Sequence, residues 1–187
     1  MNKIIAYRFM KIALLISAIF FGQQVSSQNL LELLPGAESL TFNEKTGAQI
    51  LKGNVKFQYQ GALMYCDSAY YFQKSQTIRA YSNIHLNQKD TLNLFCDSLY
   101  YDGKTNLAKL WGNVRFRDQE YKLETDSMDY NASSKYAVYR NGGVITSIDS
   151  DERLTSKVGY YHPDIKTFFF KEIISQHDLS NTYYQMF

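Results

Sequence analysis

The chain has 187 residues, of which 45% are hydrophobic, and its net charge is +2 at pH 7. Three of its basic residues lie among the first 27, so the remaining 160 residues carry 17 Lys and Arg against 18 Asp and Glu. This near-neutral remainder lacks the basic surface that nucleic-acid binding requires, so we expect no nucleic-acid partner. Its length suits one domain with a sizeable hydrophobic core.

The first 27 residues have the pattern of a secretory signal peptide. Lys3, Arg8 and Lys11 give a basic start, and an uncharged apolar run extends from Ile12 to Gly22. Small residues before Gln28 provide a cleavage site. The apolar run has eleven residues, whereas a membrane-spanning helix needs roughly 20. We therefore expect an exported protein from which residues 1–27 are cleaved.

Residues 28–39 are expected to form a short N-terminal segment ahead of the main domain, residues 40–187. The apolar stretch from Leu30 to Leu34 is closed by Pro35 and Gly36. One helical turn and a linker both fit this stretch, and the sequence does not decide between them.

From residue 40 onward the pattern predicts β-strands. Apolar and polar residues alternate from Leu51 to Tyr59 and from Leu110 to Phe116, which is typical of strands with one buried and one exposed face. Polar turns recur about every fifteen residues, and hairpins at this spacing favour antiparallel pairing. We expect an all-β fold in which two antiparallel sheets face each other.

A repeat of about thirty residues organises these strands. An aspartate motif that runs into tyrosines occurs at Asp67, Asp97 and Asp126, with Ser156 in a degenerate fourth copy. Successive copies lie 29 or 30 residues apart, so each repeat supplies two strands. Each copy begins with a small residue, an Asn and an aliphatic residue, which we expect to form a turn that leads into a strand. These segments are Gly53-Asn54-Val55, Ser82-Asn83-Ile84, Gly112-Asn113-Val114 and the degenerate Gly142-Gly143-Val144.

The two cysteines, Cys66 and Cys96, occupy the same position in successive repeats. In an exported protein such a pair suggests a disulfide. Two strands per repeat would, however, place them two strands apart, at roughly 9–10 Å. A disulfide spans no more than about 7 Å between Cα atoms. We therefore predict free thiols, and the scattered histidines give no pattern of metal ligands.

The repeated aspartates are the one candidate for catalysis. Two carboxylates that face a shared cleft are the arrangement used in glycoside hydrolysis. Asp67, Asp97 and Asp126, however, occupy identical repeat positions, each followed by a serine. Such side chains readily bond local backbone at a bend or bulge. We favour this structural role and expect no catalytic residue, no metal and no cofactor.

The inward-facing residues of the predicted strands are the candidate binding site. They suit an ordinary packed core, and they also suit a groove for an apolar ligand. Each CH₂ group buried in such a groove would contribute about 0.8 kcal/mol. The expected groove residues are Val55, Phe57, Tyr71, Ile84, Leu86, Leu99, Tyr101, Val114, Phe116, Met128, Tyr130, Val144 and Tyr160.

The C-terminal part looks like the opening of a fifth copy. Phe168–Phe170 begins an apolar stretch, and the chain ends at Phe187, near the place of the next aspartate motif. Edge strands usually carry charge or proline, which this stretch lacks. Two explanations remain open, a chain truncated at Phe187 and an edge that meets a partner. We expect an uncapped edge at Phe168–Phe170 or at Tyr183–Phe187, and head-to-tail oligomers formed through it.

The segments LKGNVKF with MYCDSAYY, YSNIHL with LFCDSLYYD, and LWGNVRF with LETDSMDYN resemble the repeats of the OstA-like family of periplasmic lipopolysaccharide-transport proteins (LptA-like). The resemblance covers roughly residues 40–187. It implies an open antiparallel β-jellyroll, shaped like a taco, whose interior carries the lipid A acyl chains of lipopolysaccharide. It also implies a periplasmic bridge of jellyroll modules joined edge to edge toward the outer membrane, which touches membranes only through its partners.

Two alternatives remain open. A structural or adhesive β-solenoid of the cell envelope would have a fully packed, dry interior. A carbohydrate-active enzyme would use the aspartates.

Overall fold

The computed structural model describes residues 31–59, 61–89, 92–150, 152–162, 165, 167–177 and 184–186. The expected signal peptide, residues 1–27, lies outside them. The described residues form one sheet of thirteen strands, and the expected all-β antiparallel jellyroll is confirmed. The strands are β1 (Glu32–Leu34), β2 (Ser39–Asn43), β3 (Ala48–Tyr59), β4 (Ala62–Phe72), β5 (Thr77–Gln88), β6 (Leu92–Asp102), β7 (Leu107–Arg117), β8 (Tyr121–Asn131), β9 (Tyr136–Tyr139), β10 (Gly143–Ser147), β11 (Arg153–His162), β12 (Thr167–His177) and β13 (Tyr184–Met186).

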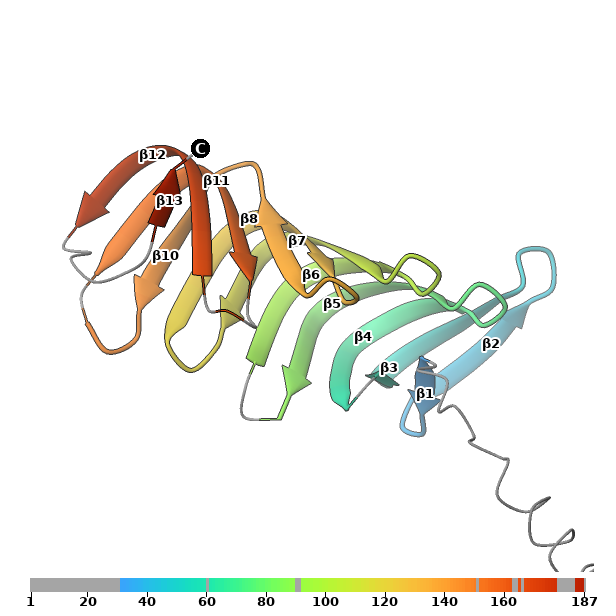
Figure 1. Ribbon diagram of the computed structural model, residues 1–187. Coiled ribbons are helices and arrows are strands. Elements are labelled where there is room, and N and C mark those ends of the chain that lie inside the picture. The colour runs from blue at the N-terminus through green and yellow to red at the C-terminus, as the bar shows by residue number, and fades with distance from the viewer. Residues whose placement is uncertain are drawn as a thin grey trace, which may run out of the picture.

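From β3 to β8, strands that follow one another in the sequence lie side by side in the sheet (Figure 1). The order is β1-β3-β4-β5-β6-β7-β8-β10-β11-β12-β13, with β2 also paired with β3, and β9 with both β8 and β11. The pairings are antiparallel, except that β13 runs parallel to β12. Each thirty-residue repeat therefore makes two antiparallel passes, as the turn spacing predicts.

The small-Asn segments are β-bulges in the middle of strands. The register between β3 and β4 shifts at Gly53 and Asn54, which both have left-handed backbone, with φ of 69° and 48°. The same pair of left-handed residues interrupts β5 at Ser82-Asn83 and β7 at Gly112-Asn113. The prediction of a turn at these places is wrong, because each strand continues through its bulge for 11 or 12 residues in all. A bulge bends its strand and increases its twist.

The row of bulges divides the sheet into two halves that fold against each other. The first half comprises residues 48–52, 68–72, 77–81, 98–102, 107–111, 127–131, 136–139 and 158–162, and the second half comprises 55–59, 62–66, 84–88, 92–96, 114–117, 121–125, 143–147 and 153–156. Rings from the two halves touch. The Phe57 ring centroid lies 5.4 Å from that of Tyr71, and the Tyr59 centroid lies 5.6 Å from that of Tyr101. The two facing surfaces therefore belong to one folded sheet, instead of the two separate sheets that alternation predicts.

The hydrophobic core lies between these halves. Leu51 and Ala69 of the first half are completely buried, and so are Val55 and Val114 of the second. All four lie within two or three residues of the bulge region of their strand, where the halves diverge from a common fold line. The residues nearest the fold line are therefore packed, and any open interior must lie farther from it.

The N-terminal edge of the sheet is a strand split in two. Residues of β1 pair with the second half of β3, where Leu34 lies opposite Lys56. Residues of β2 pair with the first half, where Leu40 lies opposite Leu51. The sheet thus begins at Glu32, before the expected domain boundary at residue 40. Within the apolar stretch that fitted a helical turn or a linker, Glu32–Leu34 forms a strand.

The strand of the fourth repeat that corresponds to β3, β5 and β7 is also split, into β9 and β10. Both pieces lie between β8 and β11, with β9 in the first half and β10 in the second. Residues 140–142 connect them, and Gly142 has a φ of 92°. A break here, in place of a continuous bulged strand, distinguishes the fourth repeat from the first three.

Of the two expected C-terminal edges, the Tyr183–Phe187 tail contains β13, the last strand of the sheet, and Phe168–Phe170 is not an edge. Phe168, Phe169 and Phe170 of β12 pair with β13, where Tyr184, Gln185 and Met186 form a short parallel strand. The edge expected to be uncapped at Phe168–Phe170 is therefore covered by the chain's own tail.

In the described part of the chain, no helix has the length and apolar character needed to cross a bilayer.

Candidate functional site: an apolar groove between the two halves

A cavity of about 440 Å³ opens between the two halves, away from the fold line. Side chains from β3 to β8 and from β11 form its wall, and most of them are apolar. Seven of the thirteen expected groove residues line it: Phe57, Leu86, Leu99, Tyr101, Phe116, Met128 and Tyr130. The structure therefore assembles a continuous apolar wall from equivalent positions of the first three repeats.

Four further expected groove residues are core residues and do not line the cavity. Val55, Ile84 and Val114 follow the bulges directly and are at most 1% exposed. Tyr71 is also buried, and its hydroxyl group donates a hydrogen bond of 3.2 Å to the carbonyl oxygen of Leu31. These residues belong to the hydrophobic core beside the groove.

The last two expected groove residues, Val144 and Tyr160, are one position out of register. Gly143, not Val144, lies opposite Thr125, the position that Val114 faces on the other side of β8. The neighbours Ile145 and Tyr161 are the buried residues, whereas Tyr160 is 38% exposed. The repeat alignment made Ser156 equivalent to the aspartates. Ser156 is, however, buried, as is Thr125, the residue before Asp126, so Ser156 is equivalent to Thr125. The tyrosine pair Tyr160-Tyr161 was the signal that could have corrected this alignment.

Several lining residues were missed because the expected groove residues were taken only from the positions after each small-Asn pair and after each aspartate. Met64 and Leu94 stand two positions before the cysteines, and Ile78 and Ala108 stand near the starts of their strands. Alternation alone places them on the inner face. The missed lining residues include Leu31, Met64, Ile78, Leu92, Leu94, Ala108, Leu110 and Tyr161.

Polar groups at the margin of the cavity connect the two halves. The hydroxyl groups of Tyr59 and Tyr101 both donate to Oδ1 of Asn106, at 2.9 and 3.0 Å. The Asn106 amide donates in turn to Oγ of Ser133, at 2.9 Å. Burial, followed by the hydrogen bond with Tyr59, raises the pKa of Tyr101. Tyr101 therefore stays a neutral donor at physiological pH.

A second connection lies at the other end of the cavity. The hydroxyl group of Tyr161 donates to Oδ2 of Asp118. The other carboxylate oxygen of Asp118 accepts the backbone N–H groups of Glu120 and Tyr121, at 2.8 and 2.7 Å. Burial, then the Asp118 carboxylate, raises the pKa of Tyr161. Asp118 thus holds its own turn and the facing strand β11 together.

The repeated aspartates lie on the outer face, away from the cavity. Oδ2 of Asp67 accepts a hydrogen bond of 2.7 Å from the Asn83 amide, and Asp97 and Asn113 make the same contact. Each bond joins a carboxylate to the bulge of the next strand. Asp67 and Asp97 stand two strands apart, at roughly 9–10 Å, and both are exposed. They do not share a cleft, which weighs against paired-carboxylate hydrolysis.

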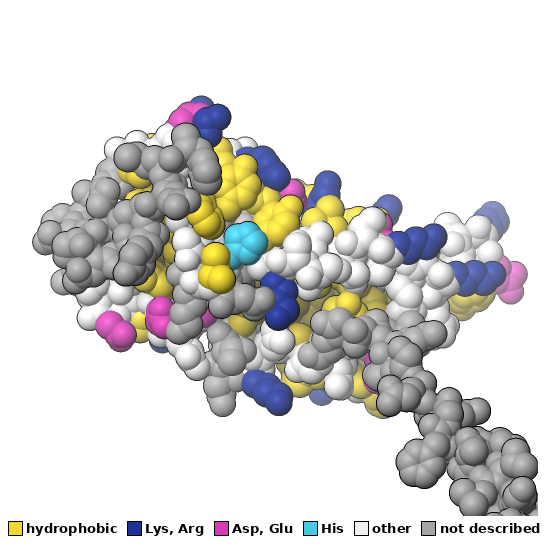
Figure 2. Space-filling model, in the orientation of Figure 1, with side chains coloured by type: hydrophobic (Ala, Val, Ile, Leu, Met, Phe, Trp, Pro, Cys, Tyr) yellow, Lys and Arg dark blue, Asp and Glu magenta, His cyan; other side chains and the backbone are white. Residues whose placement is uncertain are grey.

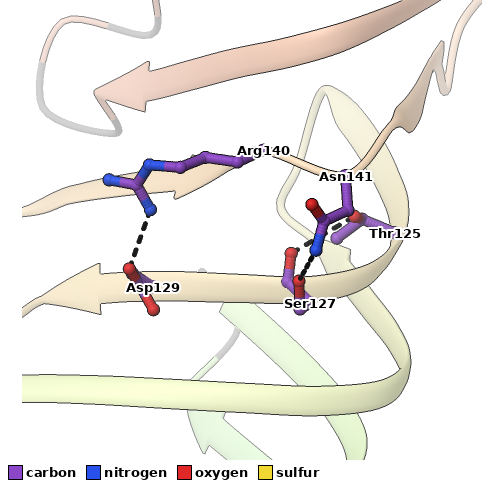
Figure 3. A network of polar contacts seen from close by, with 5 residues as sticks. All are labelled: Thr125, Ser127, Asp129, Arg140 and Asn141. Carbon is purple, nitrogen blue, oxygen red and sulfur yellow. Dashed lines mark hydrogen bonds and ion pairs between the residues drawn. The ribbon is translucent and has the colours of Figure 1, made fainter.

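The fourth repeat replaces this contact with a different polar network, drawn in Figure 3. Asn141 donates to Oγ of Ser127 at 3.2 Å, and Arg140 forms an ion pair of 2.8 Å with Asp129. The hydroxyl group of Thr125 donates to the carbonyl oxygen of Gly142 at 2.7 Å. The segment between β9 and β10 is therefore fastened to β8 at several points.

Both cysteines are buried free thiols, as predicted. Burial, then the neighbouring Asp67 or Asp97, raises the pKa of each thiol to about 12. Among the described residues, no three His, Cys, Asp or Glu side chains come together to hold a metal ion. On the face shown in Figure 2, Lys and Arg side chains are spread along the molecule and form no single patch.

The comparisons with known proteins identify a family. Residues 33–186 match the model of the family described as OstA-like protein. No match is found among curated proteins. One similar solved structure is the LptA-homologous periplasmic component LptH of the lipopolysaccharide transport device of Pseudomonas aeruginosa, with a TM-score of 0.49 and 12% identity over 56% of this chain and 77% of that one. A likeness of this strength carries no argument about ligand or partners. The family match spans most of the sequence, and the chain belongs to the OstA-like protein family.

Proposed function

We propose that this protein is a periplasmic carrier that binds lipopolysaccharide by its acyl chains and hands it on toward the outer membrane, without catalysis. Membership of the OstA-like family supports the assignment. The observation that carries it is the apolar cavity between the two halves of the sheet, walled by Phe57, Leu86 and Phe116 among others.

The wall of this cavity suits hydrocarbon. Leu86, Leu92 and Met128 present aliphatic side chains, and the tyrosines present ring faces. The Tyr101 and Tyr161 hydroxyl groups are already satisfied by Asn106 and Asp118. An acyl chain that enters would gain about 0.8 kcal/mol for each CH₂ group it buries. It would not need to break a charged contact in the core.

The inner apolar face continues to the N-terminal edge of the sheet. Leu40 lies opposite the buried Leu51 and Phe42 lies opposite Gln49, so both share the inner face. Their side chains are 55% and 61% exposed. Among the described strands, β2 pairs with β3 alone. A second jellyroll module added at β2 would cover both side chains and extend the groove.

The two alternatives have less support. A β-solenoid stacks parallel rungs around a packed interior, whereas the passes of the repeats here are antiparallel and enclose a cavity. A hydrolase would need carboxylates in a cleft, and Asp67 and Asp97 are each bonded to an Asn on the outer face.

Binding of purified lipopolysaccharide to the mature protein tests the proposal. Phe116→Asp places a carboxylate in the cavity wall, where its desolvation is costly, and should weaken binding at least tenfold. Leu86→Asp makes the same change at a half-buried position. Tyr65→Asp, on the outer face of β4, is the matched control and should bind normally. Far-UV circular dichroism must show each variant folded, and folded inner variants with unchanged binding would refute the proposal.

A further inference from the structure

The cavity is small for a lipid with several acyl chains. Its volume of about 440 Å³ lies near the lower end of the roughly 300–1,000 Å³ found for pockets that hold one drug-sized ligand. One extended acyl chain fits the dimensions of such a space. A lipid with several chains requires the two halves of the sheet to move apart.

The halves can part only by rotation about the fold line. Across that line β3, β5 and β7 run unbroken from one half to the other. The strand ladders, however, are interrupted there by the left-handed bulges. Bulges are the places where a sheet bends most readily. The margins of the two halves, which lie across the cavity from the fold line, would therefore separate first.

A hydrogen bond between Tyr59 and Asn106 joins those margins toward the N-terminal end of the cavity. The Tyr59 side chain comes from the second half, and its hydroxyl group donates to Asn106 at 2.9 Å. Asn106 belongs to the turn after β6, at the margin of the first half, and has a left-handed backbone with φ of 55°. Tyr101 and Ser133 fix the Asn106 amide in place. The Tyr59–Asn106 hydrogen bond must break when the margins separate.

We propose that Tyr59, Asn106 and Tyr101 form a latch that determines how many acyl chains the groove admits. This inference rests on the proposed function and deepens it. A single-chain lipid enters the closed cavity without disturbing the latch. A lipid with several chains must break the latch. The cost of breaking the Tyr59–Asn106 hydrogen bond therefore lowers the affinity for the lipid with several chains and leaves the affinity for a single-chain lipid unchanged. Tyr59, Asn106 and Tyr101 thereby set chain-number specificity.

The latch can be removed without removing the packing around it. Tyr59→Phe deletes the hydroxyl group and leaves the ring beside Tyr101, at a centroid distance of 5.6 Å in the parent protein. Asn106→Gly deletes the acceptor, and glycine tolerates the left-handed backbone of this position. Tyr65→Phe, on the outer face, makes the same chemical change away from the cavity and is the control.

Two probes separate the outcomes: a fluorescent twelve-carbon fatty acid and lipid A, each titrated against the mature protein and its variants. Tyr59→Phe and Asn106→Gly should each bind lipid A roughly 2- to 10-fold more tightly, the range that one lost hydrogen bond predicts. Binding of the fatty acid should not change. The double variant should bind lipid A no more tightly than either single variant, because both remove the same contact.

Equal changes for both probes, or a change for neither, would overturn the latch while leaving the carrier function intact. Failure of the parent protein to bind either probe would overturn the carrier function and the latch together. If Asn106→Gly does not fold, the comparison of Tyr59→Phe with its control Tyr65→Phe tests the latch by itself.

Discussion

Tyr139 fills the break between β9 and β10, and two glycines make room for it. A β-carbon on Gly143 would come within 2.7 Å of the Tyr139 ring, and one on Gly159 would also overlap the ring. The Tyr139 hydroxyl group lies 2.7 Å from Oγ of Ser156, and burial raises the pKa of Tyr139 to about 12. The two glycines are needed for space, so the glycine-rich start of the fourth repeat has a packing role.

Replacing Gly159 with Ala should lower the free energy of unfolding by about 1–3 kcal/mol, because the added methyl group overpacks the site. Urea denaturation measures the change. In a Tyr139→Leu background the ring is gone, and Gly159→Ala should cost much less. A cost that is the same in both backgrounds would show that Tyr139 is not the reason for the glycine.

The buried thiols give a prediction about pH. Each folded-state pKa is about 12, above the value of about 8.5 for a thiol in an unfolded chain. The neutral thiol is therefore favoured by folding. Its contribution to stability is fully present below about pH 8.5 and is lost as the pH rises toward 12. At pH 8 both thiols of the native protein should resist alkylation.

Both cysteines should then react fully in denaturant without any reductant. A thiol reagent with an absorbance readout measures this on one sample before and after denaturation. Reaction that begins only after a reductant is added would reveal a disulfide and contradict the placement of β4 and β6 on opposite sides of β5.

At the scale of the element, alternation was enough to find the strands but not to recognise the bulges. A Gly-Asn pair with left-handed backbone occurs in hairpin turns as readily as in bulges. Whether the pair forms a turn or a bulge depends on a residue in the preceding strand. Asn83 donates a hydrogen bond to Asp67, and Asn113 donates one to Asp97, each 16 positions away. A local pattern does not contain that information. The parallel pairing of β13 with β12 was missed for the same reason, because it joins residues about 16 positions apart.

The carboxylate–Asn contact at a bulge should stabilise the protein measurably. Asp97→Ala removes the acceptor for Asn113 and should lower the free energy of unfolding by about 1 kcal/mol, the usual contribution of an exposed hydrogen bond. Asp126→Ala is the matched control, because the following bulge segment uses Asn141 and Ser127 instead. Equal costs for the two substitutions would remove the Asn contact as the reason for the repeated aspartate.

At the scale of the molecule, the inner face of the first three repeats could be predicted from the sequence, and the shape of the interior could not. Phe57, Leu86 and Phe116 share a repeat position, and the cavity is built on them. Whether such residues meet across a packed core or leave an opening depends on how far the sheet bends at its fold line. Tyr59 and Asn106, 47 positions apart, therefore had no local signal.

The exposed apolar edge of β2 predicts assembly. Phe42→Lys should reduce concentration-dependent association, because a charge on an edge strand blocks strand addition. Trp111→Lys, in the central strand β7, is the control, because its exposed side chain (43%) lies far from both edges of the sheet. Light scattering across a concentration series measures the effect. A parent protein that stays monomeric at every concentration would contradict self-association through β2.

The central claim is that lipid occupies the space between the two halves. Photo-crosslinking in living cells tests it most directly, with a photoreactive amino acid placed at Leu86 or Tyr130 on the cavity wall and at Tyr65 on the outer face. The account predicts lipopolysaccharide adducts at the two inner positions and none at Tyr65. Adducts at all three positions, or at the outer position alone, would contradict it.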